Sequence, residues 1–307
     1  MISNSNSSVL ETIDYLIEKF STQVRIKNGK EVTGSSNAKD YRMLKNSLGK
    51  FVHEIYKKSL SSFSFKNIDS KFLLDYVDYL EKRATDTKTK GVVPNRLKKF
   101  QAVFNHAREM GVKGVDRSIF RCVEDKKKIS EVKPSIIPYK VIEQIENIDR
   151  DKFSPTELFH VDLFLFSFYS AGMSCSDMAH LTSANIKKRV ITYEKMRVHR
   201  IVETSLIATS EAIISAHRDK CYGDYVLPIF SVKHITEKQQ RDRIERLSLQ
   251  ANKTLEKVRK QIGYRKKITL SSTLAAFIAE MIKANVDPYY IALNTGCTIE
   301  YISKHFL

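Results

Sequence analysis

Hydrophobic residues recur at helical spacing along most of the chain. Ser8 and Glu11 have the spacing of an N-terminal capping box, and an apolar stripe runs through the residues around them. Further stripes follow a Gly/Ser-rich break at residues 27–37, begin near Asp69, and begin at Pro94, which suits the first turn of a helix. Residues 8–120 are therefore predicted to form a bundle of about four amphipathic helices. The side chains expected to face its core are Leu10, Ile13, Ile17, Phe20, Tyr41, Leu44, Leu48, Phe51, Ile55, Phe72, Leu73, Tyr76, Val77, Leu80, Leu97, Phe100, Phe104 and Ala107.

A polar and basic segment, residues 121–138, separates this bundle from the rest of the chain. It ends in two closely spaced prolines, and we predict an extended linker between domains. A helix is expected from Pro138, followed by a nearly all-apolar helix at 158–169 that would form the buried centre of a second domain. The sequence thus predicts a helical first domain at 1–120, a linker at 121–138 and a second domain at 139–307.

The spacing changes from helical to alternating at residues 189–206. Alternation of apolar and polar side chains is typical of strands, so two short strands joined by a basic tip are expected there. Helical spacing resumes from Glu211, over 236–263 and 270–284, and from Pro288 and Thr298. The predicted fold class is mainly α, with a small antiparallel sheet in the second domain.

The chain is strongly basic, with a formal net charge of +17 over 307 residues. Residues 1–138 hold 27 Lys and Arg against 16 Asp and Glu, and residues 139–307 hold 25 against 19, so the excess is +11 in one part and +6 in the other. Positive charge on both domains favours a polyanionic partner gripped by two lobes, and double-stranded DNA is the predicted partner. A membrane-surface role is disfavoured, because no segment combines a basic face with an aromatic one.

Other classes of protein are excluded by what the sequence lacks. The longest apolar run, Leu163 to Tyr169, is too short to span a bilayer, and residues 1–10 do not have the pattern of a signal peptide, so a cytoplasmic location is expected. The four cysteines are scattered and no His lies at metal-ligand spacing, so neither a metal site nor a disulfide framework is predicted. No Gly-rich phosphate loop is present, and no cofactor is predicted.

Several phrases of the sequence match a known family in the same order. They are "FNHAREMGVKGVDRSIF" at 104–120, "LFLFSFYSAGMSCSDMAHLTSANI" at 163–186, "VITYEKMRVHRIVETSL" at 190–206, "YVLPIF" at 225–230 and the stretch from Ile268 to Leu307. The ordered set resembles the tyrosine recombinase (phage integrase) family, especially its Bacteroides-type members. The resemblance spans nearly the whole chain and implies a SAM-like core-binding bundle followed by an integrase catalytic-type domain.

The resemblance also implies a chemistry. Members of the family cut DNA with a tyrosine that becomes joined to the 3′ phosphate, two arginines and a histidine stabilise the negative transition state, and a hairpin lysine protonates the leaving oxygen. The position of the first arginine falls here on Ser174, with Ala171 as its displaced alternative, and that of the lysine falls on Arg197 or the nearby Lys195. The His-x-x-Arg pair falls on Ser271 and Leu274. The second histidine falls on Cys297 and the tyrosine on Phe306.

These substitutions predict the loss of the cleavage machinery. Without the nucleophile and both arginines, neighbouring groups cannot recover the reaction, since one arginine in a phosphoryl transition state is worth about 10³–10⁵ in rate. Leu274 and Phe306 are expected to be packing residues, because Leu274 continues an apolar stripe through Phe277, Ile278 and Met281. Tyr301 is the nearest tyrosine, and helical geometry predicts that it lies on a different face from Phe306.

Basic residues are present where the resemblance implies DNA contacts, whereas the catalytic residues of the family are replaced. By resemblance, one cluster lies on a core-binding helix that faces the major groove, a second on the hairpin tip that enters the minor groove, and a third before the helix of the His-x-x-Arg box. The predicted DNA-binding residues are Arg96, Lys98, Lys99, Lys195, Arg197, Arg200, Arg265, Lys266 and Lys267.

The favoured hypothesis is a DNA-binding protein of the integrase family, in the context of DNA integration or recombination within a mobile element, that does not cleave DNA. Two alternatives stay open. The chain could be an active site-specific recombinase with noncanonical residues, Tyr301 being the first candidate nucleophile, or a scaffold that pairs with an active recombinase or with a second copy of itself.

Overall fold

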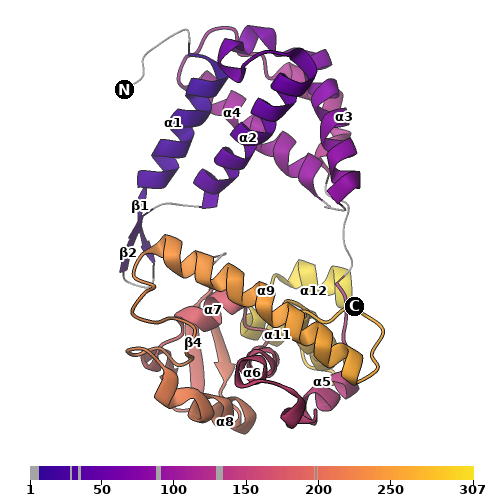
Figure 1. Ribbon diagram of the computed structural model, residues 1–307. Helices are drawn as coiled ribbons and strands as arrows, with labels where there is room; N and C mark the ends of the chain where they lie inside the picture. Colours follow the sequence, from indigo (N-terminus) through magenta and orange to yellow (C-terminus); the bar gives the residue numbers. More distant parts are fainter. Residues whose placement is uncertain are drawn as a thin grey trace. The chain divides into compact units, whose positions relative to one another are not determined.

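A computed structural model describes residues 7–27, 30–33, 36–87, 91–128, 134–196, 198 and 200–307. The chain forms two compact units, Met1–Val132 and Lys133–Leu307 (Figure 1). Both units are mainly helical, so the predicted fold class is confirmed. Among the helices of the described ranges, none is both long enough and apolar enough to cross a membrane.

The first unit is a helical bundle with a small hairpin. Its helices are α1 (Val9–Thr22), α2 (Ser36–Tyr56), α3 (Ser70–Thr87) and α4 (Val92–Glu109), its strands are β1 (Val24–Lys27) and β2 (Lys30–Thr33), and its 3₁₀ turns are η1 (Leu60–Ser62), η2 (Phe65–Asn67), η3 (Ser118–Val123) and η4 (Asp125–Lys127). The predicted capping box begins α1: the Ser8 hydroxyl accepts a hydrogen bond from the Glu11 amide, and the Glu11 carboxylate accepts one from the Ser8 amide.

Aromatic side chains fill the core of this unit. The rings of Phe51 and Phe72 meet edge to face with centroids 5.1 Å apart, and Phe104 meets Phe120 in the same way at 5.1 Å. Such pairs add about 0.5–1.5 kcal/mol to the burial of their area. Most of the predicted core positions are buried, but Ile55 is 53% exposed and faces solvent, whereas the next residue, Tyr56, packs on the rings of Phe51 and Phe72.

Two segments of the first unit differ from the prediction. The break at 27–37 contains a strand, because apolar and polar residues alternate over β1 and β2, which pair antiparallel with Val24 opposite Thr33. Residues 121–127, expected to be extended, form 3₁₀ turns that bury Val123 and Lys127 against the bundle. The Lys127 ammonium there bonds to Gln101 Oε1 at 2.9 Å. Part of the predicted linker, 129–133, lies outside the described residues.

The second unit packs helices around one apolar helix. Its helices are α5 (Tyr139–Glu146), α6 (Pro155–Tyr169), α7 (Cys175–His180), α8 (Ala208–His217), α9 (Glu237–Gln261), α10 (Ser272–Lys283), α11 (Pro288–Thr295) and α12 (Ile299–Phe306), its strands are β3 (Ile186–Lys187), β4 (Val190–Glu194) and β5 (Ile201–Ser205), and its 3₁₀ turns are η5 (Arg150–Lys152), η6 (Ser183–Asn185) and η7 (Arg218–Lys220). Helix α6 is buried from His160 to Phe168 and contacts α8, α9 and α10, as predicted for the centre of the domain.

The alternating segment forms the predicted hairpin. Strands β3, β4 and β5 make an antiparallel sheet in that order, with Tyr193 opposite Val202. Ile191 and Val202 point into the core and are fully buried, whereas Ile201 is exposed, as expected for a sheet that packs on one face. The hairpin therefore places Lys195 and Arg200 at its tip, beside the ends of β4 and β5.

Candidate functional site

The turn that follows α6 packs directly on the first turn of α10. Ala171 and Gly172 both have positive φ angles, +56° and +71°. A Cβ atom added to Gly172 would lie 2.4 Å from Leu274 Cα, which is closer than real Cβ contacts. The structure thus brings together two family boxes that lie about a hundred residues apart in the sequence, through contact between Gly172 and Leu274.

Two buried hydroxyl groups hold this turn in place. The Ser167 hydroxyl donates to the Met173 carbonyl at 2.7 Å and lies 2.6 Å from the Thr273 hydroxyl. Thr273 in turn donates to the Leu270 carbonyl at 2.9 Å. Neither residue is among the positions predicted from the sequence, although Ser167 interrupts the apolar run from Leu163 to Phe168 with a hydroxyl.

Ser174, the position of the first family arginine, caps a helix. Its hydroxyl accepts from the Asp177 amide at 3.2 Å and donates to Asp177 Oδ2 at 2.6 Å, which starts α7. The other oxygen of the buried Asp177 accepts from the Met196 amide at 2.8 Å and so fastens α7 to the hairpin tip. Ser174 therefore has a complete local role that needs no phosphate.

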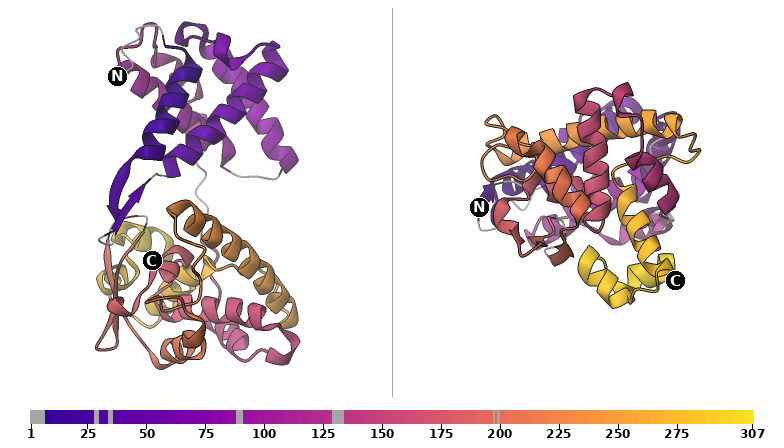
Figure 2. Two further views of the ribbon diagram at one scale, coloured as in Figure 1. Left: turned by 60° about the vertical axis from the view of Figure 1, so that its left-hand side comes forward. Right: turned by 90° about the horizontal axis from the view of Figure 1, so that it is seen from below.

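Three other family positions lie in one hydrophobic cluster formed by α10, α11 and α12. Leu274, Cys297 and Phe306 are partly buried and pack against the buried residues Ile278, Ile291 and Ile302. Figure 2 shows α11 and α12, in yellow, lying against each other at one side of the second unit. The residues predicted at the positions of an arginine, a histidine and the tyrosine of the family are thus in apolar contact.

Tyr301 belongs to the same cluster. Its ring centroid lies 5.9 Å from that of Phe306 and 4.8 Å from that of His305, so the expected separation of Tyr301 from Phe306 is wrong. The two rings reach each other because both lean over the apolar cluster from the short helix α12. Burial raises the pKa of the Tyr301 phenol, and the nearby Cys297 thiol adds to the rise. A raised pKa opposes formation of the phenolate and is the reverse of what a nucleophile needs.

The cations at the hairpin tip bind the turn between α11 and α12. The Lys195 ammonium donates to the Thr295 carbonyl at 2.7 Å, and Arg200 Nη1 donates to the Cys297 carbonyl at 3.2 Å. Gly296, between these carbonyls, has a φ of +64° and ends α11. Cations beside the last carbonyls of a helix are stabilising. Arg197, predicted at the same tip, lies outside the described residues.

Replacing Lys195 with Met is expected to loosen the α11–α12 turn. The variant keeps most of the apolar stem but removes the charged hydrogen bond to Thr295, which is worth about 1.5–3 kcal/mol. Hydrogen exchange of the amides at 294–302 should become faster. The exposed Lys187 on β3 is the matched control, because Lys187→Met removes the same charge without touching the turn. Unchanged exchange in Lys195→Met would contradict the role assigned to this bond.

The predicted cations on α4 differ in their surroundings. Lys98 is exposed and Arg96 is half-buried. Lys99, with a side chain only 19% exposed, donates to Asn37 Oδ1 at 2.9 Å, lies 3.6 Å from Asp40 Oδ2, and stands over the Tyr41 ring at 4.7 Å. Lys99 thus joins α4 to the beginning of α2, and its ammonium is engaged within the bundle, whereas the DNA contact predicted for it needs an open ammonium.

The third basic cluster is open to solvent. Arg265, Lys266 and Lys267 are all exposed in the segment between α9 and α10. The neighbouring Ser271, at the family histidine position, lies at the start of α10, where its hydroxyl meets that of Thr269 at 3.0 Å. Within the described ranges, no group of three or more His, Cys, Asp or Glu side chains is arranged to hold a metal ion.

Comparison with known proteins agrees with this architecture. Residues 8–123 match the family model of the phage integrase SAM-like domain. A lambda integrase dimer bound to a COC′ core site is similar over 96% of this chain and 94% of its own, with a TM-score of 0.63 and 10% identity. The integrase of transposon Tn1549, in complex with transposon right end DNA, is similar over 98% of this chain and 95% of its own, with a TM-score of 0.62 and 10% identity. No curated protein sequence matches the chain.

The chain therefore has the two-unit fold of the tyrosine recombinases. Its first unit matches the phage integrase SAM-like domain, and over the whole chain the resemblance that the sequence indicates is confirmed at the level of the fold. The assignment to Bacteroides-type members stays a prediction.

Proposed function

We propose that the chain binds double-stranded DNA in a recombination or integration context and does not cleave it. The observation that carries this proposal is the combination of a net charge of +17 with apolar contacts at Leu274, Cys297 and Phe306. The similar lambda and Tn1549 integrases were solved as DNA complexes, which supports DNA as the partner. Exposed cations in both units, Lys98 in one and the Arg265–Lys267 cluster in the other, are suited to contact phosphates.

The absence of cleavage rests on the groups that surround the family positions. Leu274 offers no positive charge to a transition state, and Ser174 spends its hydroxyl on the cap of α7. The tyrosine nearest to Phe306 in the sequence is Tyr301, whose phenol has a raised pKa. Lys195 is a candidate for the lysine that protonates the leaving oxygen, but its ammonium already donates a hydrogen bond to the Thr295 carbonyl. A site of this kind can bind a DNA duplex without cleaving the sugar–phosphate backbone of the DNA.

Two adjacent lysines give a matched test of the DNA-binding surface. Lys98→Gln should reduce the slope of log binding constant against log salt by about 0.9, because one phosphate contact is lost. Lys99→Gln should leave the slope unchanged and lower the free energy of unfolding by about 1–2 kcal/mol, since it removes contacts with Asn37, Asp40 and Tyr41. Fluorescence anisotropy with a labelled duplex over a salt series measures the slope, and thermal unfolding measures the stability.

Other results of the same series would overturn the proposal. A wild-type chain that ignores duplex DNA at low salt and co-purifies with a recombinase would favour the scaffold alternative. A covalent protein–DNA adduct that disappears in Tyr301→Phe would favour an active recombinase.

A further inference from the structure

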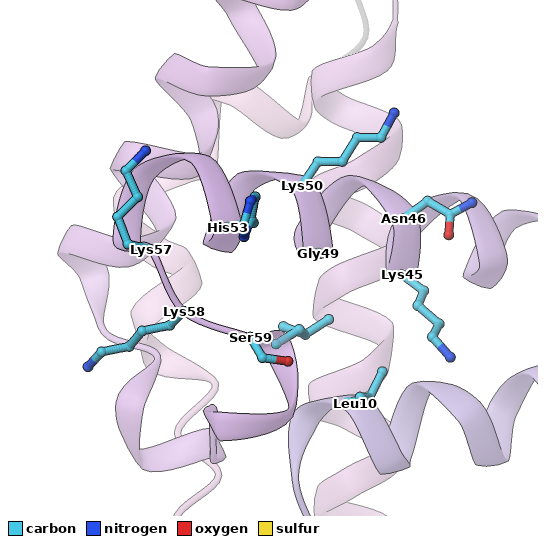
Figure 3. A pocket seen from close by; sticks show the side chains of 10 residues that line it. Leu10, Lys45, Asn46, Gly49, Lys50, His53, Lys57, Lys58 and Ser59 are labelled. Carbon is cyan, nitrogen blue, oxygen red and sulfur yellow. The ribbon is translucent and has the colours of Figure 1, made fainter.

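The first unit contains a basic pocket that the proposed function does not use. It has a volume of about 700 Å³ and lies between the beginning of α1, the second half of α2 and the loop that leads to η1 (Figure 3). Lys45, Lys50, His53, Lys57 and Lys58 line it together with small and apolar residues, and no carboxylate is among the lining residues. The pocket is therefore suited to an anionic ligand.

Three of these cations are available to a ligand. Lys45 is paired with Asp14 at 2.6 Å. Lys50, Lys57 and Lys58 are exposed, and no described residue forms an ion pair with them. Figure 3 shows the ammonium groups spread around the rim and pointing away from one another. Such a spread does not close around one compact anion, but it matches an extended ligand with repeated charges.

Two residues of the pocket depart from what a helix prefers. Gly49 lies in the interior of α2, where glycine destabilises a helix, and a Cβ atom added there would meet nothing within 4 Å. Lys57 follows the last residue of α2 with a φ of +54°, a position that glycine usually fills. Glycine at 49, where a helix favours a side chain, keeps the pocket open. Lysine at 57, where glycine is favoured, adds a cation to its rim. Departures of this kind are expected at functional sites.

The pocket is separate from the predicted DNA-binding end of the bundle. Lys99, next to Lys98 on α4, bonds to Asn37 and Asp40 at the beginning of α2. The lining residues on α2 run from Lys45 to His53, which lie about 8 Å and about 20 Å along the helix from Asp40 at about 1.5 Å per residue. A ligand in the pocket therefore occupies a different end of the first unit from a duplex that contacts Lys98.

We propose that this pocket binds the sugar–phosphate backbone of a second DNA segment while another duplex occupies the predicted DNA-binding surface. A nucleic acid backbone is the extended polyanion that suits a rim of separate lysines around an open floor, and its contacts carry no sequence preference. The inference goes beyond the proposed function, on which it rests only for the nature of the ligand.

A sequential capture experiment on the full chain tests this site. The protein is bound to an immobilised duplex, and a labelled second duplex is then added at low salt. The double variant Gly49→Leu with Lys57→Gly fills the pocket and removes one rim charge. Both changes restore residues that the helix prefers, so the variant should unfold at the same or a higher temperature than the wild type. We expect it to bind the first duplex normally and the second about tenfold more weakly.

The controls separate the possible outcomes. Lys71→Gln removes one exposed charge from α3, outside the pocket, and should leave capture of the second duplex unchanged. Equal capture by the wild type and the double variant would overturn the proposal, as would binding of one duplex with no capture of another. Binding of poly-glutamate that is lost in the double variant, while DNA capture persists, would assign the pocket to an acidic protein segment. Failure to bind any duplex would overturn both this inference and the proposed function.

Discussion

Gly172→Ala is expected to lower the free energy of unfolding of the second unit by about 3 kcal/mol or more. The added methyl group would lie 2.4 Å from Leu274 Cα, and a backbone atom cannot turn away as a flexible side chain can. The φ of +71° adds a strain of about 1–2 kcal/mol for any residue with a Cβ atom. Differential scanning calorimetry, together with hydrogen exchange of amides in α6 and α10, measures the effect.

Gly263→Ala is the matched control for this prediction. Its φ of +66° is nearly the same, but an added Cβ atom would meet nothing within 4 Å. The control should therefore show only the conformational cost of about 1–2 kcal/mol. If both variants lost the same stability, the turn after α6 would be able to move away from α10, and the close contact would not be a fixed part of the fold.

Phe306→Tyr is expected to restore no cleavage of DNA. The new hydroxyl would stand in the cluster of α10, α11 and α12, and the residues predicted at the two family arginine positions are Leu274, in this cluster, and Ser174, at the cap of α7. Each missing arginine corresponds to about 10³–10⁵ in rate, so a nucleophile alone leaves the reaction undetectable. A suicide substrate carrying a nick near the scissile phosphate, followed by a denaturing gel, detects any covalent adduct.

Partial restoration makes this second prediction stricter. Phe306→Tyr combined with Leu274→Arg should also give no adduct, because Ser174 still supplies no charge. The duplex affinity of both variants has to match that of the wild type, so that absence of an adduct reports on chemistry. An adduct in Phe306→Tyr alone would show that other cations complete the site, and the predicted loss of the arginine pair would be wrong.

Much of the fold was predictable because it depends on local spacing. The helical stripes and the alternation over β4 and β5 are periodic signals, and the capping box at Ser8 is a short motif. The hairpin at 24–33 was missed because a Gly/Ser-rich composition outweighed a short alternation. Its sequence nevertheless contains Asn28-Gly29, a strong hairpin signal.

The candidate site was predictable only in part, because its contacts join residues that are distant in sequence. Lys195 and Thr295 are 100 residues apart, so a basic hairpin tip gave no sign that its ammonium is already bound. Lys99 likewise appears as one of a run of cations until its contact with Asn37 is seen. The resemblance assigns three family positions to Leu274, Cys297 and Phe306, which share one cluster in the structure, and the assignment itself stays a prediction.

The hydrogen bonds of Lys195 and Arg200 set up a competition at the hairpin tip. A phosphate that attracts either cation has to separate it from the Thr295 or Cys297 carbonyl, and that carbonyl is then left without its charged donor. At about 1.5–3 kcal/mol for each such bond, the affinity of this cation for phosphate is reduced by about one to two orders of magnitude. Helices α11 and α12 and any polyanion therefore compete for Lys195 and Arg200. By linkage, whatever separates these helices from the hairpin also strengthens the binding of phosphate by the two cations.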